Sequence, residues 1–260
     1  MTAAVVGIFG VGAIGGSIGL RARKNGVRVI GADCDAAALE AAREVGAIDE
    51  AAPVEEVPPA VDVLVLAAHL QPTLDEIERL KRAAGSMPAL IIDVASVKTP
   101  VVAAATGLKN FVATHPMAGT ERSGARAARA DLFDGRTWAY VPSGDHALDE
   151  RARMFIASMR AVPLAISAED HDRAVAITSH VPQILAWNYA KLLRAQGEGA
   201  EKLCGPVARE LLRISGMTAT MWHDILKANA GNIEPQLRAL CDELQAASSA
   251  LSVGDGHCGE

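Results

Sequence analysis

The feature that most constrains the fold is a glycine-rich loop close to the start of the chain. A short apolar run, residues 3–9, is followed by Gly10, Gly12 and Gly15 in the spacing G-x-G-x-x-G. The run suits a buried parallel strand, and the residues after the loop continue as a helix. Gly10 can turn tightly out of the strand, Gly12 leaves room beside the backbone, and Gly15 lets the helix pack closely. The pattern predicts a phosphate-binding loop, although the spacing alone also fits an ordinary glycine-rich turn.

A second expected strand, residues 28–32, leads into Asp33. An acidic residue about 20 positions beyond such a loop can accept hydrogen bonds from the ribose of a dinucleotide. Its negative charge repels a 2′-phosphate, so we expect NAD to be preferred over NADP. Asp35 adds a further negative charge but is better explained as the cap of the next helix, residues 36–45. The predicted cofactor-binding residues are Gly10, Gly12, Ala13, Ile14, Gly15, Asp33 and Ser96.

Strands and helices alternate over the first two thirds of the chain. Further strands are expected at residues 61–68, 89–94, 111–114, 137–142 and 161–166. This alternation predicts a doubly wound parallel sheet of the Rossmann type, in which ligands lie beyond the carboxyl ends of the strands. Ser96 and His115 each follow one of these strands. A histidine at this edge, beside a nicotinamide, can act as the general base of an alcohol oxidation. A structural histidine that satisfies a loop is an equally good interpretation.

The remainder of the chain is expected to be helical. We predict a nucleotide-binding domain at 1–167 and an all-α domain at 168–260. The second domain is expected to contain one long helix over 171–195, bent near Pro182, and one or two more helices over 222–247. Its helices carry more apolar surface than a single layer would bury, which predicts a homodimer formed through this domain. A loose tail is expected from residue 248.

Composition excludes several classes of function. The net charge is −6 and no basic tract occurs, which argues against a nucleic acid or an anionic membrane as partner. Only Met1 and Thr2 precede the first apolar run, so the charged start of a signal peptide is missing. Six glycines within residues 7–19 would weaken a membrane-spanning helix. The four cysteines are too widely spaced for a zinc site or a disulfide framework. We expect a cytoplasmic protein that acts on a small molecule.

Several longer motifs carry a family resemblance. DVASVK, THPMAGTERSG, HDRAVAITSHVPQILA and MWHDI follow the glycine loop in this order. Together they resemble the prephenate and arogenate dehydrogenases of tyrosine biosynthesis, from the loop to about Asn232. The resemblance implies that C4 of a cyclohexadiene gives a hydride to NAD while C1 loses carbon dioxide, which leaves an aromatic ring. It also implies that His115 accepts the hydroxyl proton, and that Ser96 hydrogen-bonds His115 and faces the nicotinamide.

The same resemblance assigns cationic residues to the substrate. The family motif F-R-D-x-T-R-I-A aligns with ARELLRIS, residues 208–215. It implies that Arg213 holds a substrate carboxylate through two hydrogen bonds, with Arg209 nearby. Two solvated arginines on one helix are the alternative. Ala208, Glu210 and Leu212 depart from the motif and leave the identity of the substrate open.

Three further residues are assigned to the pocket by resemblance. His180 matches a second family histidine near the substrate, although a packed helix histidine is the alternative. Thr120 and Glu121 match positions that line or gate the pocket. Gln183 replaces a family histidine. Prephenate, arogenate and an amino-substituted analogue all remain open as substrates. A hydroxyacid dehydrogenase, an imine reductase or a non-catalytic dinucleotide-binding protein are the alternative functions.

Overall fold

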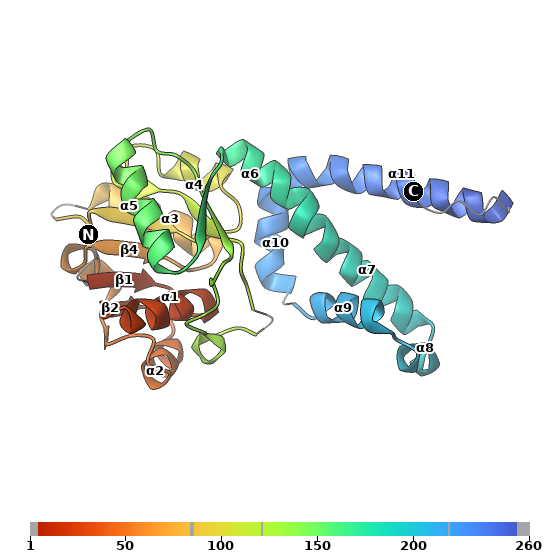
Figure 1. Ribbon diagram of the computed structural model, residues 1–260, viewed down its shortest axis with the longest axis horizontal. Helices are drawn as coiled ribbons and strands as arrows, with labels where there is room; N and C mark the ends of the chain where they lie inside the picture. Colours follow the sequence, from red (N-terminus) through yellow and green to blue (C-terminus); the bar gives the residue numbers. More distant parts are fainter. Residues whose placement is uncertain (1–4, 84–85, 121, 218, 254–260) are drawn as a thin grey trace. The chain divides into compact units, whose positions relative to one another are not determined.

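The computed structural model describes residues 5–83, 86–120, 122–217 and 219–253. It divides into two compact units, Met1–His171 and Asp172–Glu260, coloured red to green and green to blue in Figure 1. The boundary predicted from the sequence, between residues 167 and 168, falls at the start of helix α6 (Ala168–Val175), and the two units divide within this helix.

The N-terminal unit is built on a six-stranded parallel sheet with the order β3-β2-β1-β4-β5-β6. Its strands are β1 (Val5–Phe9), β2 (Arg28–Ala32), β3 (Glu50–Ala51), β4 (Val63–Leu66), β5 (Leu90–Asp93) and β6 (Phe111–Val112). The order reverses between β1 and β4, which is where a doubly wound sheet opens a crevice for its ligand. The short strand β3 was not predicted, because two residues carry no readable alternation.

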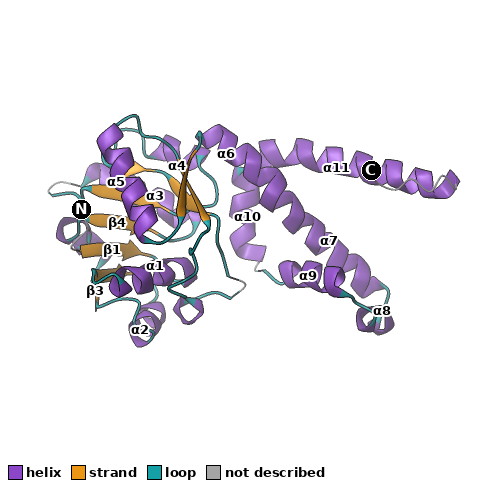
Figure 2. Cartoon of the chain, viewed as in Figure 1, coloured by secondary structure: helices purple, strands orange, loops and turns teal. Residues whose placement is uncertain are grey.

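Helices cover both faces of this sheet (Figure 2). One hydrophobic cluster packs helices α1 (Ala13–Lys24), α2 (Ala36–Glu44) and α5 (His146–Ser158) on one face. A second cluster packs α3 (Leu70–Arg82) and α4 (Thr99–Ala104) on the other. Short 3-10 turns of three residues each also occur in this unit, namely η1 (Val54–Glu56), η2 (Pro58–Ala60) and η3 (Ala125–Ala127). Apolar strands covered on both faces are the signature of a doubly wound parallel sheet, so the predicted fold class is confirmed.

The last expected strands form a separate small sheet instead of extending the large one. It has the order β7-β8-β9, with β7 (Thr114–Pro116), β8 (Thr137–Tyr140) and β9 (Val162–Ala165). The expected strand 111–114 is interrupted at Ala113. The residues before it form β6 of the large sheet, and the residues after it begin β7, which pairs antiparallel with β8 of the small sheet. In the described part of the connection between β7 and β8, the helical element is the short turn η3, whereas the crossover of a parallel pair is usually an α-helix.

Every described element of the C-terminal unit is helical, as predicted. Helix α6 runs into a π-helical turn, η4 (Ala176–His180), and then into α7 (Val181–Ala195). The expected long helix is therefore nearly continuous, and its irregularity lies just before Pro182. A π turn accommodates an inserted residue, and Pro182 supplies no N–H at the first turn of α7. The remaining helices are α8 (Glu198–Lys202), α9 (Pro206–Ser215), α10 (Ala219–Ala228) and α11 (Ala230–Val253).

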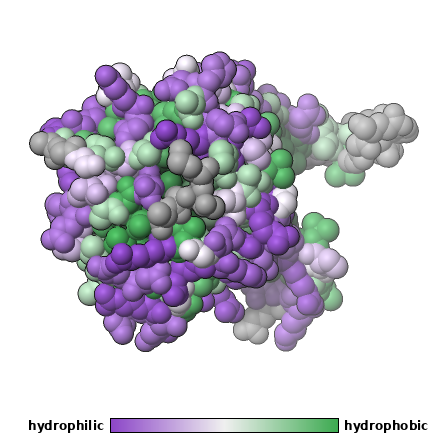
Figure 3. Space-filling model, turned by 60° about the vertical axis from the view of Figure 1, so that its left-hand side comes forward, coloured by the Kyte–Doolittle hydropathy of each residue, from purple (hydrophilic) through white to green (hydrophobic). Residues whose placement is uncertain are grey.

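The prediction of a loose tail from residue 248 is partly wrong. Helix α11 continues to Val253, well past residue 248. The hydroxyls of Ser249 and Ser252 donate to carbonyl oxygens four residues earlier, which satisfies these polar side chains within the helix. Residues 254–260 lie outside the described part. Among the described helices, none is both long and apolar enough to cross a membrane. Hydrophilic residues predominate on the face drawn in Figure 3, with hydrophobic residues gathered in smaller areas.

Candidate active site

The three motif glycines differ in what a side chain at each position would meet. Gly10 has a φ of +91°, and a Cβ there would lie 2.7 Å from the backbone of Ala67. A Cβ on Gly15 would lie 2.0 Å from the carbonyl oxygen of Gly10, so only glycine allows α1 to approach the strand this closely. Gly12 is the N-cap of α1, and a Cβ there would meet nothing within 4 Å. The space beside Gly12 is therefore not filled by any other atom of the described chain, and it lies at the N-terminus of helix α1.

This space fits a dinucleotide pyrophosphate. The first N–H groups of a helix have no intrahelical acceptors and carry part of the positive end of the helix dipole. Ala13 and Ile14 form the first turn of α1, and the half-buried Ile14 packs against the core. An anion can therefore approach the backbone at Gly12 without meeting a side chain.

Asp33 lies where the ribose-binding carboxylate was expected. It follows β2, and one of its oxygens accepts the backbone N–H of Val11 at 2.9 Å. The other oxygen accepts the backbone N–H of Asp35 at 3.0 Å. The carboxylate is thus fixed against the glycine loop while keeping acceptor capacity. Asp35 caps α2 by accepting the N–H of Ala37 at 2.9 Å, as the sequence predicted.

The carboxyl ends of the central strands lie side by side. Phe9 pairs in register with Ala32 and with Leu66, and Leu66 pairs with Asp93. The residues after these four positions therefore lie along one edge of the sheet. Ser96 follows β5 at this edge and is half-buried. The edge is the ligand-binding side of such a sheet.

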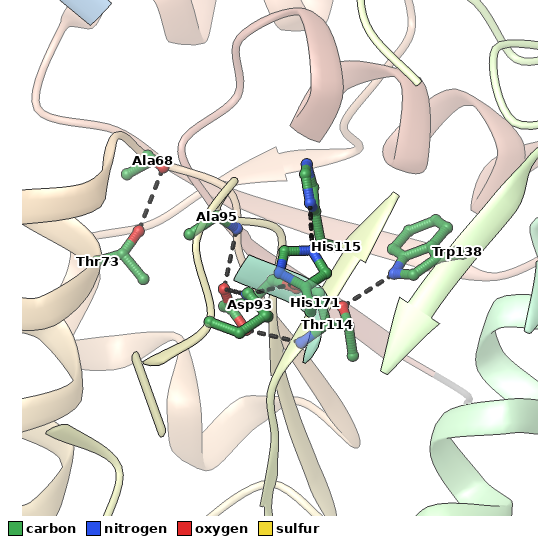
Figure 4. A network of polar contacts seen from close by, with 9 residues as sticks. Ala68, Thr73, Asp93, Ala95, Thr114, His115, Trp138 and His171 are labelled. Atoms are coloured by element: carbon green, nitrogen blue, oxygen red, sulfur yellow. Dashed lines mark hydrogen bonds and ion pairs between the residues drawn. The ribbon is translucent and has the colours of Figure 1, made fainter. Parts of the chain in front are cut away.

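A fully buried ion pair holds the segment that carries His115. The Lys98 ammonium contacts the Asp93 carboxylate and the carbonyl oxygen of Thr114, and neither charged side chain is exposed at all. Asp93 also accepts the backbone N–H of Thr114 at 2.8 Å and that of Ala95 at 2.9 Å. Trp138 Nε1 donates to the Thr114 hydroxyl at 2.9 Å (Figure 4). These hydrogen bonds fix the backbone next to His115.

His115 itself is half-buried and contacts a second histidine. Its Nδ1 lies 2.9 Å from Nε2 of His171, and the two rings meet edge to face with centroids 5.1 Å apart (Figure 4). Neighbouring residues of a strand point to opposite sides, so Thr114 faces the buried ion pair while His115 faces away from it. His171 is buried and lies on α6.

Sequence reasoning gave no role to His171, Asp93 or Lys98. All three occur in the motifs HDRAV and DVASVK, but neither motif states which of its residues is buried or what it contacts. Thr120, by contrast, was assigned to the pocket, and its hydroxyl donates to the carbonyl oxygen of Arg122. Glu121 lies outside the described residues.

His180 is enclosed within the C-terminal unit. It ends the π turn and is 1% exposed. Its Nδ1 accepts from the amide nitrogen of Asn229 at 3.1 Å, and its ring meets the ring of Trp222 edge to face. Asn229 also donates to the carbonyl oxygen of Asp172 at 2.7 Å. These contacts are those of a packed histidine with a satisfied ring nitrogen.

Both predicted substrate arginines lie on α9. Arg209 donates through Nε to the carbonyl oxygen of Cys204 at 2.8 Å. Arg213 is exposed and holds both carboxylate oxygens of Glu210, with Nε 2.8 Å from Oε2 and Nη2 2.5 Å from Oε1. The hydrogen bond from Arg213 lowers the pKa of Glu210. Arg213 therefore already shows bidentate binding of a carboxylate, in the geometry that a substrate acid would use.

The fold and this site define a class of protein. A doubly wound sheet with a glycine cradle, a carboxylate after the second strand and a histidine at the same edge is the scaffold of a dinucleotide-dependent oxidoreductase. Residues 18–161 match the family model described as the prephenate dehydrogenase nucleotide-binding domain. Residues 167–257 match its dimerization domain. The chain belongs to the prephenate dehydrogenase family, and the resemblance read from the sequence motifs is confirmed.

Individual relatives agree with this family. A probable prephenate dehydrogenase of Streptomyces niveus is 37% identical over 260 residues, covering 96% of this chain and 69% of that protein. The prephenate dehydrogenase of Bacillus subtilis is 33% identical, covering 87% of this chain and 64% of that protein. The chain thus spans about two thirds of the length of these curated relatives.

The fold is also that of a solved structure. Prephenate dehydrogenase from Aquifex aeolicus, crystallised with hydroxyphenyl propionate and NAD+, superposes with a TM-score of 0.86. The two chains are 24% identical, with 96% of this chain and 91% of that chain covered.

Proposed function

We propose that this protein catalyses the NAD-dependent oxidative decarboxylation of a cyclohexadienyl acid, prephenate or arogenate. The observation that carries the proposal is the position of His115 at the carboxyl edge of the sheet. A buried ion pair fixes the backbone beside it, and its Nδ1 is hydrogen-bonded to His171. Family membership favours this activity over a hydroxyacid dehydrogenase, an imine reductase or a non-catalytic binding protein. The products would be 4-hydroxyphenylpyruvate from prephenate and tyrosine from arogenate.

NAD supplies the acceptor for the hydride that leaves C4 of the substrate. Gly10, Gly12 and Gly15 would hold its pyrophosphate, and Asp33 its ribose, which favours NAD over NADP. Ser96 lies at the same edge of the sheet. The glycine cradle and the fixed carboxylate support NAD as the cofactor.

His115 performs the proton transfer. The C4 hydroxyl gives its proton to Nε2 of His115, because Nδ1 is occupied by His171. The bond from C1 to the carboxylate then breaks, and its electrons complete the aromatic ring and reach the C4 oxygen, which recovers a proton. A positioned base contributes about 10²–10⁴-fold to the rate. Aromatisation supplies most of the driving force, so the protein chiefly orients its groups.

Arg213 is proposed to bind a carboxylate of the substrate, with Arg209 supporting the same helix. The guanidinium already holds Glu210 in a bidentate pair, so a substrate acid would replace one carboxylate with another. His180, Thr120 and Glu121 stay proposed neighbours of the substrate on family grounds.

The protein is also proposed to be a homodimer assembled through its C-terminal unit. The match to a dimerization domain supports this proposal. Large aliphatic side chains of the unit are exposed by 54% to 86%, namely Leu192, Leu203, Val207, Leu244 and Leu251. Sedimentation should give twice the chain mass of 27.1 kDa, and a species of the single mass at micromolar concentration would contradict the proposal.

The catalytic assignment is tested with His115→Asn. Asparagine keeps a polar side chain of similar reach but cannot accept the proton as a base. Turnover should fall by about 10²–10⁴-fold while the Kd for NAD stays unchanged. Turnover like that of the unmodified enzyme would remove His115 from the role of base.

A further inference from the structure

The contact between His115 and His171 joins two parts of the chain that are far apart in sequence. Nδ1 of His115 and Nε2 of His171 are 2.9 Å apart, across 56 residues of sequence. His171 is only 2% exposed. A buried imidazole that loses its water needs a hydrogen-bond partner, because an unsatisfied buried polar group costs about 1–3 kcal/mol. The contact is therefore a hydrogen bond between the two rings as well as a packing contact.

We propose that His171 is a positioning residue, which fixes the tautomer and the ring orientation of His115 so that Nε2 of His115 is the basic nitrogen. The proposal rests on the proposed function, because it assumes that His115 is the base. It gives a role to a side chain that does not itself touch the reacting atoms.

The direction of this hydrogen bond follows from counting protons. A neutral imidazole carries one N–H, so in this contact one ring donates and the other accepts. If Nδ1 of His115 donates to Nε2 of His171, then Nε2 of His115 has a free electron pair and can take the substrate proton. If His171 donates instead, the single proton of His115 lies on Nε2 and that nitrogen cannot act as a base. Catalysis by His115 therefore requires His171 to be protonated on Nδ1 and to accept at Nε2.

The small sheet explains how the two rings meet. His115 lies on β7 and pairs in register with Ala139 of β8. Strand β8 pairs with β9, and the backbone N–H of Ile166, just after β9, donates to Tyr140 at 3.0 Å. The chain enters α6 two residues later, and the N–H of His171 donates to the carbonyl oxygen of Ser167 at 2.9 Å. Three paired strands and one helical turn thus connect the two histidines.

The ring of His115 and its backbone are fixed by separate groups. Lys98 and Asp93 hold the backbone at Thr114, on the side of β7 opposite to the ring. The contact with His171 acts on the ring, at Nδ1. Loss of His171 should therefore change the tautomer of His115 while leaving the path of the chain in place.

The kinetic test compares His171→Phe with His171→Gln. Phenylalanine fills the buried space but cannot accept a hydrogen bond, so kcat should fall by about 100-fold, with the KM and the Kd for NAD within threefold of the unmodified enzyme. Glutamine can place a carbonyl oxygen near the lost Nε2 and should recover most of this loss. The control is His146→Phe, at an exposed histidine that begins α5, and it should leave kcat unchanged. An unchanged kcat in His171→Phe, or equal losses in the Phe and Gln variants, would overturn the proposal.

A spectroscopic test does not depend on any substrate. In protein labelled with ¹⁵N-histidine, two-bond ¹H–¹⁵N correlations report which ring nitrogen carries the proton. We expect His115 and His171 both to be protonated on Nδ1, and His115 to shift toward the Nε2–H form in His171→Phe. An Nε2–H form of His115 in the unmodified protein would refute the role of His171. If the tautomers are as expected but no cyclohexadienyl acid is turned over, the proposed function fails while the positioning contact stands.

Discussion

The glycine cradle leads to a sharp prediction for Gly12→Ala. The added methyl group meets nothing in the described chain within 4 Å, and the φ of Gly12 is −70°, which alanine adopts without strain. The fold should therefore tolerate the change, at a cost of about 0.5–1 kcal/mol because alanine is a poorer N-cap than glycine. The methyl group does occupy the space proposed for the pyrophosphate. Losing one hydrogen bond from a backbone N–H to a charged oxygen costs about 1.5–3 kcal/mol.

This free energy corresponds to about 10- to 150-fold weaker NAD binding. Calorimetric titration with NAD measures the change, and the melting temperature of the free protein checks the fold. Gly205→Ala is the matched control, because Gly205 is also an N-cap, of α9, and its Cβ would also meet nothing within 4 Å. It should leave NAD affinity unchanged. A Kd for NAD within twofold of the original in Gly12→Ala would show that the pyrophosphate lies elsewhere.

Three further substitutions test separate parts of the molecule. Asp33→Ser removes the charge that repels a 2′-phosphate and should improve NADP use relative to NAD by about tenfold or more in steady-state assays; an unchanged ratio would contradict the ribose assignment. Arg213→Ala should raise the substrate KM by about 10- to 150-fold. Arg238→Ala removes a more exposed ion pair, the one with Glu234, and should leave the substrate KM unchanged. Lys98→Met leaves a buried carboxylate unpaired and should lower the free energy of unfolding by about 3–5 kcal/mol in urea titrations. A loss below 1 kcal/mol would contradict this reasoning.

Much of the N-terminal unit could be predicted because its signals are local. The G-x-G-x-x-G spacing, the apolar strands and Asp33 each follow from residues close together in sequence, and the helix cap at Asp35 needs only a short polar side chain. The resemblance to the family rested on longer motifs and is confirmed. Periodicity also located most helices of the C-terminal unit.

The second sheet and the contacts around His115 could not be predicted in the same way. Strand length and hydrophobicity do not state which strands pair, so β8 and β9 were assigned to the large sheet. The bond between His115 and His171 joins residues 56 positions apart, and no local pattern encodes it. The burial of Lys98 could not be predicted either, because lysine is almost never fully buried unless it is paired, and its partner is not marked in the sequence.

Helix termini were hard to predict for a physical reason as well. The serines near residue 248 resemble a loop in composition, yet their hydroxyls bond to the preceding helical turn. Helix α11 therefore extends to Val253.

The proposed activity is tested most directly by NADH formation with the purified protein, NAD and either prephenate or arogenate in parallel. We predict that NADH appears together with an equal amount of carbon dioxide on at least one of the two substrates. Turnover of only one would also fix whether the side chain is a keto acid or an amino acid. If NAD binds but neither substrate yields NADH, the proposed function is wrong, and the altered stretch 208–215 would be the first place to look for a different substrate.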